Sequence, residues 1–386
     1  MILFIFKAMS MRYYKLFVYA VISFSLLVSC EQDMPTDISS ADYIMFSVPQ
    51  LKVESSSRSS FIEDELPDGS SFGVMGYCVP YQNMTTEPDW NSGSAVWSAK
   101  RPNVHPDVFD NQKVTYSSAS GSCSYTNTEG TLTKWYNTTD NTEAVNPDDY
   151  RYTFFAYYPY LDINPCFTVS TTDNSGKGAP IFKFTMPFSD GDNNTLRYDS
   201  KTPDAMLAVN YNLLRTGGNV TFAFSHIMVG LGFSLSNYNF ADTDVITVNS
   251  IKLTGSFVKS LTVDFNKATN ESGFFTYSDR YNGYFNIIDS SVTINPGETE
   301  EPEKHLLLLT DNISGSFFGD VNLEINYTYN GSEKTVTAGR PTDFKPQPGV
   351  KYTAQLSFVG ETFILDFVAA ENEIWENGGD SNITIQ

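Results

Sequence analysis

Hydrophobic and polar side chains alternate over short stretches along most of this chain. In residues 321–329 the odd positions hold Val, Leu, Ile, Tyr and Tyr, and the even positions hold Asn, Glu, Asn and Thr. A period of two places these sets on opposite faces of a β-strand, one buried and one wet, as in antiparallel sandwiches. Similar stretches recur between clusters of Gly, Asn, Asp, Ser and Pro, which favour turns. The other predicted strands are 43–48, 72–77, 152–158, 181–186, 206–211, 220–224, 229–235, 250–253, 292–294, 352–358 and 363–368.

The composition also favours strands. Aromatic residues make up 15% of the 386 residues and charged residues only 18%, and aromatic side chains suit a pleated, half-buried surface. No apolar stripe with helical spacing continues beyond about two turns. The sequence therefore predicts an all-β protein, and its length fits two domains. The turn-rich stretch 215–218 gives the expected boundary, with an N-terminal β-sandwich over 42–215 and a C-terminal β-sandwich over 216–386.

Residues 1–29 have the features of a signal peptide. Arg12 and Lys15 precede the apolar run 16–28, which is too short to cross a bilayer of roughly 30 Å as a helix. The following Leu-Val-Ser-Cys sequence at 27–30 is typical of a bacterial lipobox, in which the cysteine thiol receives a diacylglycerol before cleavage. The alternative is an ordinary secretory signal with a coincidental cysteine. We expect a lipid on Cys30 and a tether over residues 30–41.

Removal of the signal peptide makes an acidic chain more acidic. Residues 1–29 include three basic residues and no acidic residue, so the net charge falls from −21 to −24. Such a surface repels nucleic acid and anionic lipid headgroups, so we expect contact with the membrane through the lipid alone. Besides Cys30 the chain has Cys78, Cys123 and Cys166. Three cysteines cannot all pair within one chain, and the sequence does not select a pair for one disulfide.

The sequence offers little for catalysis. It has three histidines, His105, His226 and His305. His226 ends an alternating stretch, where an orienting hydrogen bond in or beside the core explains it better than catalysis does. The chain contains no serine-hydrolase, zinc-protease or dinucleotide-binding motif. We therefore expect no enzymatic activity and no cofactor.

Two loops are similar to ligand-binding motifs but depart from them. The Ser-Gly-Lys-Gly sequence at 175–178 is similar to part of a phosphate-binding loop, but Thr171 stands where the first glycine belongs. Residues 190–194 (DGDNN) offer oxygens to calcium. However, Thr195 and Lys201 replace the Gly and Glu that an EF-hand requires. A turn rich in Asp and Asn is the better interpretation, and we expect no metal site.

The tryptophans leave an alternative function open. Exposed aromatic rings can stack on sugars, although tryptophans in sandwiches are more often buried. A carbohydrate-binding surface lipoprotein that serves glycan uptake is therefore the alternative to a structural role. The four candidates for such stacking are Trp90, Trp97, Trp135 and Trp375.

The order of several segments resembles the fimbrillin-like lipoproteins of Bacteroidales, the major and minor fimbrial subunits. Each segment is common by itself, and their order and spacing carry the resemblance. The C-terminal SNITIQ at 381–386 departs from the family because it is short and polar. The matching segments are the lipobox at Cys30, YIMFSV at 43–48, SSSRSS around Arg58, FGVMGY at 72–77, Trp90 with Trp97, YRYTFFAYYP at 150–159, PDAMLAV at 203–209, VTFAFSHIMVGLGFSL at 220–235, PGVKYTAQLSF at 348–358 and Trp375 with Gly378 and Gly379.

The resemblance implies two transthyretin-like antiparallel β-sandwich domains in tandem and a non-enzymatic structural or adhesive role in cell-surface fimbriae at the outer membrane. It also implies assembly with other fimbrial subunits by strand complementation. An arginine-specific protease, cutting here at Arg58, removes the first strand, and a strand of a neighbouring subunit replaces it. Ile44, Phe46 and Val48 are then the side chains expected to fill the groove. The sequence does not indicate a host or bacterial surface ligand.

Overall fold

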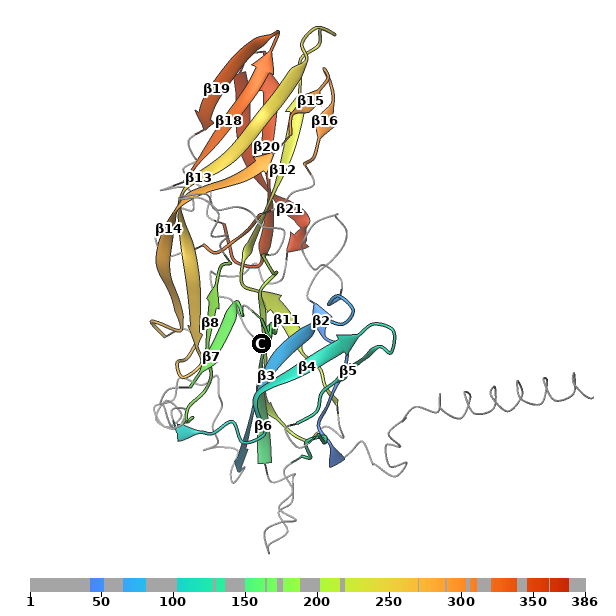
Figure 1. Ribbon diagram of the computed structural model, residues 1–386, viewed down its shortest axis with the longest axis vertical. Helices are drawn as coiled ribbons and strands as arrows, with labels where there is room; N and C mark the ends of the chain where they lie inside the picture. Colours follow the sequence, from blue (N-terminus) through green and yellow to red (C-terminus); the bar gives the residue numbers. More distant parts are fainter. Residues whose placement is uncertain are drawn as a thin grey trace, which may run out of the picture.

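The computed structural model describes residues 42–51, 65–80, 103–127, 130–135, 150–163, 165–171, 176–187, 202–215, 219–269, 271–288, 290–302, 306–310, 321–338, 346–360 and 362–374. The regular elements of these residues are strands, β1 to β21, which confirms the all-β prediction (Figure 1). None of the described residues forms a helix long and apolar enough to cross a membrane. The molecule is elongated, with β3 and β6 near one end and β18 and β19 near the other (Figure 1).

A seven-stranded sheet forms the N-terminal half, in the order β2-β11-β9-β6-β3-β4-β5. Its central strand β6 is buried on both faces: Phe154 packs into one hydrophobic cluster and Phe155 into another. This explains why the sequence of β6 from Tyr152 to Tyr158 is apolar except for Thr153 and does not alternate. The strands are β2 (Gln50–Leu51), β3 (Ser71–Pro80), β4 (Phe109–Ser117), β5 (Ser122–Ser124), β6 (Tyr150–Tyr158), β9 (Met206–Leu213) and β11 (Ala223–His226).

A second sheet covers one face of the first and continues into the C-terminal half. Its order is β19-β18-β13-β8-β7, and β14 and β15 also pair with β13. The long strand β13 pairs with β18 near its beginning and with β8 at its end, so it connects both halves of the molecule. The strands are β7 (Phe167–Ser170), β8 (Ile181–Thr185), β13 (Ile246–Asp264), β14 (Phe275–Ile288), β15 (Val292–Ile294), β18 (Val321–Tyr329) and β19 (Ser332–Ala338).

A third sheet completes the C-terminal half. It has the order β16-β12-β20-β21, with β17 also paired to β12. Leu231 and Phe233 of β12 share one buried cluster with Ile325 and Tyr327 of β18, so these two sheets face each other across a core. The strands are β12 (Val229–Asn237), β16 (Thr299–Glu300), β17 (Leu306–Leu308), β20 (Val350–Val359) and β21 (Thr362–Ile374).

Several strands that precede residue 215 in the sequence pair with strands that follow it. β10 (Asn219–Val220) pairs with β1 (Met45–Phe46), and β11 pairs with β9 of the N-terminal sheet. In the second sheet, β8 pairs with β13. The sheets are mainly antiparallel, but β1–β10, β2–β11 and β12–β20 are parallel pairs. The boundary at 215 and the division into two transthyretin-like domains stay predictions.

Candidate functional site: the first segment and its surroundings

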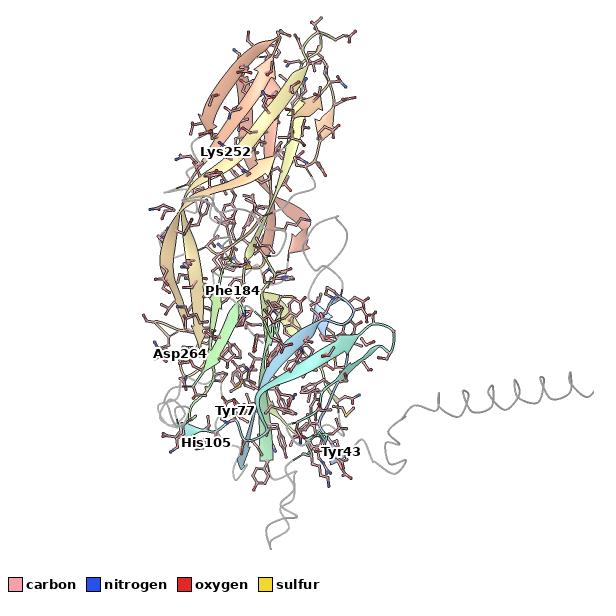
Figure 2. All side chains as sticks on the ribbon, viewed as in Figure 1. Tyr43, Tyr77, His105, Phe184, Lys252 and Asp264 are labelled. Carbon is pink, nitrogen blue, oxygen red and sulfur yellow. The ribbon has the colours of Figure 1, made fainter. Side chains whose placement is uncertain are left out.

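The first segment, residues 42–51, lies between two other parts of the chain at the edge of the N-terminal half. Its beginning pairs with residues 133–135, through a bridge between Tyr43 and Lys134. Its remainder runs parallel to residues 219–224, first beside β10 and then beside β11. Tyr43 marks this place in Figure 2, at the end of the molecule that holds β3 and β6. We call residues 123–125, 133–135 and 219–224 the first-strand site.

Backbone hydrogen bonds hold the first segment at separate points along its length, and the amide of Trp135 donates to Asp42 O at 3.0 Å at its beginning. The amide of Ile44 donates to Thr133 O at 2.9 Å, and farther along, the amide of Ser47 donates to Val220 O at 3.1 Å. The amide of Gln50 donates to Phe222 O at 2.8 Å. Both strands of the segment, β1 and β2, are only 2 residues long. The ladder is therefore short and interrupted, because the chain moves from β10 to β11 between them.

Side-chain packing holds the first segment more firmly. Ile44 is fully buried, and Phe46 is 4% exposed. The Phe46 ring stacks on Phe222 with centroids 5.6 Å apart and meets the edge of Tyr125 at 5.5 Å. Three more aromatic rings surround it, those of Phe72, Phe109 and Phe154.

Val48 departs from the expected alternation. It is only half-buried, although it packs against the same cluster, and Pro49 is buried next to it. The alternation ends here because residues 47–49 belong to neither β1 nor β2. Of the three predicted groove residues, the structure thus brings Ile44 and Phe46 fully into the core and Val48 partly.

Two further side chains of the first-strand site contact the first segment. The Tyr125 hydroxyl donates to Ile44 O at 2.6 Å, and the Cys123 thiol lies 3.5 Å from Ser47 O. Cys123 is buried, and this burial raises the pKa of its thiol to about 12. Sequence reasoning gave no role to Tyr125 or Cys123, because only the fold brings them to the first segment.

The chain is also anchored after the first segment. Leu66 is buried, and the Tyr116 hydroxyl donates to Glu65 Oε2 at 2.7 Å. The amide of Ser118 donates to Asp68 Oδ1 at 2.7 Å. Arg58, the expected processing site, lies outside the described residues, as does Cys30. Both described flanks of the expected cut are thus held by the fold.

The described histidines give no catalytic arrangement. His226 is buried at the end of β11, and its Nδ1 lies 2.8 Å from Oδ1 of Asp204, which stands just before β9. This agrees with an orienting role in the core. His105 is exposed, and His305 lies outside the described residues.

Of the two loops that are similar to ligand-binding motifs, one is bonded to other parts of the fold and the other lies outside the described residues. Gly178 accepts a hydrogen bond from the Tyr77 hydroxyl at 3.0 Å, and its amide donates to Val104 O at 2.7 Å. These bonds tie the loop to the core. Residues 190–194 are not described. The described part of the chain contains no group of three or more His, Cys, Asp or Glu side chains that could hold a metal.

The described residues include three cysteines and one tryptophan of the candidates considered above. Cys78, Cys123 and Cys166 are free thiols. Trp135 is buried and packs edge-on against Tyr152, with centroids 4.7 Å apart, so it cannot offer its face to a sugar. Trp90, Trp97 and Trp375 lie outside the described residues.

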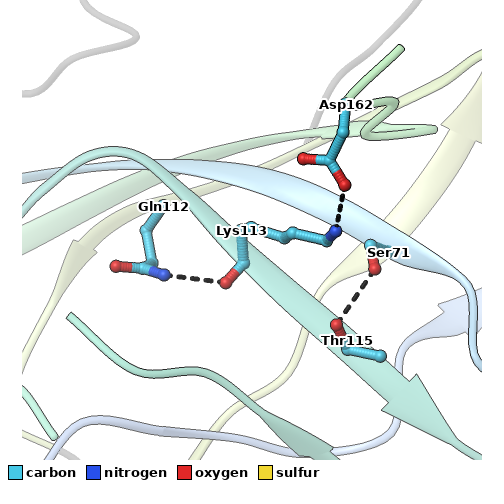
Figure 3. A network of polar contacts seen from close by, with 5 residues as sticks. All are labelled: Ser71, Gln112, Lys113, Thr115 and Asp162. Carbon is cyan, nitrogen blue, oxygen red and sulfur yellow. Dashed lines mark hydrogen bonds and ion pairs between the residues drawn. The ribbon is translucent and has the colours of Figure 1, made fainter. Parts of the chain in front are cut away.

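The polar network of β3 and β4 is a surface feature (Figure 3). Lys113 forms an ion pair with Asp162, and the two side chains are 40% and 63% exposed. The hydroxyls of Ser71 and Thr115 lie 3.0 Å apart across the two strands. Ion pairs as exposed as this one contribute at most about 1 kcal/mol. The ion pair ties the chain after β6 to β4.

Comparison with known families identifies the chain's relatives. A sequence profile described as fimbrillin-like matches residues 83–372, which is more than half of the chain. The chain belongs to the fimbrillin-like family. The resemblance inferred from the order of its segments is thereby confirmed. This membership places the chain among fimbrial and cell-adhesion proteins, which act at the cell surface. No curated protein matches the sequence.

Solved structures resemble this family member at low sequence identity. A fimbrial protein from Bacteroides vulgatus is 18% identical, with a TM-score of 0.50, over 85% of this chain and 99% of that chain. A Bacteroides uniformis protein assigned to cell adhesion is 15% identical, with a TM-score of 0.47, over 87% and 100%. The tip fimbrial protein Mfa3 from Porphyromonas gingivalis is 9% identical, with a TM-score of 0.34, over 81% and 96%. At these identities the likeness concerns the fold alone.

Proposed function

We propose that this chain is a non-enzymatic structural or adhesive subunit of cell-surface fimbriae. It is exported as a lipoprotein with a diacylglycerol on Cys30 and is held at the outer membrane. Cleavage at Arg58 then removes the first segment, and a strand of another fimbrial subunit takes its place. Family membership supports the fimbrial role, and the N-terminal sequence supports the lipid. Ile44 and Phe46, with half-buried Val48 beside them, fill the groove in the precursor.

The assembly step rests on one observation: the side chains of the first segment are buried, and its backbone ladder is short and interrupted. Losing a buried Phe side chain such as Phe46 typically costs about 3–5 kcal/mol, whereas each net backbone hydrogen bond contributes only about 1 kcal/mol. Removing the segment would therefore leave an apolar site beside unpaired backbone groups of β10 and β11. Any strand that offers apolar side chains at alternate positions could fill it.

Cys123 reports on this step because Ser47 covers it. In the chain that begins at residue 31, cleavage with an arginine-specific protease followed by removal of the first segment should expose the thiol. A pKa that falls from about 12 to the usual 8.5 or so increases the reactive thiolate at pH 8 by roughly a thousandfold. We expect rapid maleimide labelling of Cys123, located by peptide mass spectrometry, and renewed protection when a peptide with the sequence of residues 42–51 is added.

Cys166 is the matched control, because it is buried in the cluster on the other face of the N-terminal sheet. Its labelling should not change when the first segment leaves. The variant Arg58→Ala should keep Cys123 protected under the same protease treatment. Equal labelling of Cys123 with and without the first segment would contradict strand complementation at this site.

The lipid anchor has a separate test. Cells that express the full chain are grown with a palmitate analogue, and the purified protein is assayed for the label. We expect label on the wild type and none on Cys30→Ala, because only the cysteine thiol can accept the diacylglycerol. Equal labelling of both proteins would refute the lipoprotein assignment and leave the fimbrial assignment standing.

A further inference from the structure

Exposed hydrophobic side chains gather at the end of the molecule opposite the first segment. Tyr238 is 57% exposed, Phe240 98%, Val359 49% and Ile364 62%. The first two lie in the distal loop, residues 238–245, which joins β12 to β13 at the far end of the C-terminal half (Figure 1). The other two lie on β20 and β21.

The strand register brings three of these side chains onto one face. Asn237 is paired with Phe358, so Tyr238 follows opposite Val359, and the amide of Tyr238 donates to Phe358 O at 2.9 Å. On the other side of β20, Ser357 is paired with Ile364, and Val359 with Thr362. Ile364 is therefore the diagonal neighbour of Val359, within reach of a large side chain. Phe240 lies two residues beyond Tyr238. We call Tyr238, Phe240, Val359 and Ile364 the distal patch.

Buried asparagines fix the backbone that carries the distal patch. The side chain of Asn237 donates to Asp244 O at 2.8 Å and to Ile294 O at 3.0 Å. Asn239 accepts a bond from the Gly360 amide at 2.6 Å and donates to Gly360 O at 3.4 Å. Asn237 is 1% exposed and Asn239 9%. The fixed loop thus keeps the Phe240 ring exposed to solvent. Contact residues on a rigid backbone lose little conformational entropy when they bind a partner.

Acidic side chains flank the distal patch. Asp242 is exposed two residues beyond Phe240 in the distal loop, and Asp366 is exposed two residues beyond Ile364 on β21. We call these two carboxylates the acidic rim. This rim, like the net charge of −21 for the whole chain, disfavours another copy of the chain or an anionic membrane as the partner. Val359 and Ile364 are aliphatic and cannot stack on a sugar ring. Exposed aromatic faces inside an acidic rim instead suit arginine or lysine with apolar neighbours.

We propose that the distal patch is a docking surface for a protein partner whose contact segment is both basic and apolar. Arginine or lysine side chains of the partner pair with the acidic rim and cover the rings of Tyr238 and Phe240. Apolar side chains of the partner bury Val359 and Ile364. This surface is separate from the first-strand site and goes beyond the proposed assembly by strand complementation.

A phage-displayed library of random 12-residue peptides tests the proposal. It is selected in parallel against the chain that begins at residue 31 and against its Phe240→Ser variant. Because Phe240 is almost fully exposed, the variant should fold normally. The matched control is Ile163→Ser, which removes another exposed side chain, 81% exposed, from the N-terminal half.

We expect the selected peptides to be rich in arginine or lysine beside aromatic or aliphatic residues. Their binding should fall at least tenfold in Phe240→Ser and with rising salt, and should not change in Ile163→Ser. Absence of enriched peptides, a selected set without net positive charge, or equal binding to Phe240→Ser would overturn the proposal. So would Phe240-dependent sedimentation with phosphatidylcholine vesicles, which would identify a membrane surface. Labelling of Cys123 does not depend on Phe240, so failure here leaves the assembly proposal intact.

Discussion

The first segment and the distal loop each carry a phenylalanine, and the two are held in opposite ways. Phe46 is 4% exposed and Phe240 is 98% exposed. The backbone around Phe46 has only a 2-residue ladder to β10, whereas two buried asparagines fix the backbone beside Phe240. A buried side chain on a backbone with a short ladder can be replaced by another strand with the same pattern. An exposed side chain on a fixed backbone presents a constant surface to a partner.

The largest effect that sharpens this comparison is expected at Phe46. Phe46→Ala removes the ring that touches five other aromatic rings. The free energy of unfolding of the N-terminal half in the unprocessed chain should fall by about 3–5 kcal/mol. Urea unfolding followed by aromatic fluorescence measures it. Gln50→Ala, an exposed position on the same segment, should change the value by less than about 0.5 kcal/mol. Similar losses in both variants would show that the segment is not held by its side chains.

An intermediate effect is expected at Asn239. Asn239→Ala leaves the half-buried amide and carbonyl of Gly360 without their side-chain partner, and each lost hydrogen bond costs about 1 kcal/mol. Hydrogen exchange of the Gly360 amide should become much faster than in the wild type, while exchange in β6 stays the same. Asn322→Ala, at an exposed position of β18, is the control and should leave both regions unaffected. An unchanged Gly360 amide in Asn239→Ala would mean that the distal loop is fixed by other contacts.

The smallest effect on stability is expected at Phe240. Phe240→Ser removes a side chain that is almost entirely in water, so the free energy of unfolding should change by less than about 0.5 kcal/mol. The same urea titration measures it beside Phe46→Ala. A loss above about 1 kcal/mol would show that Phe240 packs against the protein, and the contrast with Phe46 would no longer hold.

The strands that could be predicted from the sequence are those whose faces keep the same burial along their whole length. Residues 321–329 alternate because one face of β18 is buried, and the predicted bounds match the strand. Residues 152–158 are apolar except for Thr153 because both faces of β6 are covered. Alternation also predicted that Ile44, Phe46 and Val48 are buried; Ile44 and Phe46 are buried, and Val48 is half-buried. Local patterns thus report how much of a strand is covered.

The remainder depends on contacts that local patterns do not encode. Residues 250–253 were expected to be a short strand, but they are part of the 19-residue β13, whose surroundings change along its length. β14 was missed because its middle is polar and contains Asp279 with a φ of 58°, which is typical of a turn. The parallel pairing of the first segment with residues 219–224 joins positions far apart in the sequence, and nothing in either stretch fixes that register.

The length of β13 has a mechanical consequence. At about 3.3 Å per residue, its 19 residues extend roughly 60 Å. One end pairs with β18 in the C-terminal half and the other with β8, whose core faces the N-terminal sheet. When such a molecule is pulled along its long axis, hydrogen bonds across these pairs are loaded in shear and share the force. The two halves should therefore extend as one stiff unit, without a weak hinge between them that opens at low tension.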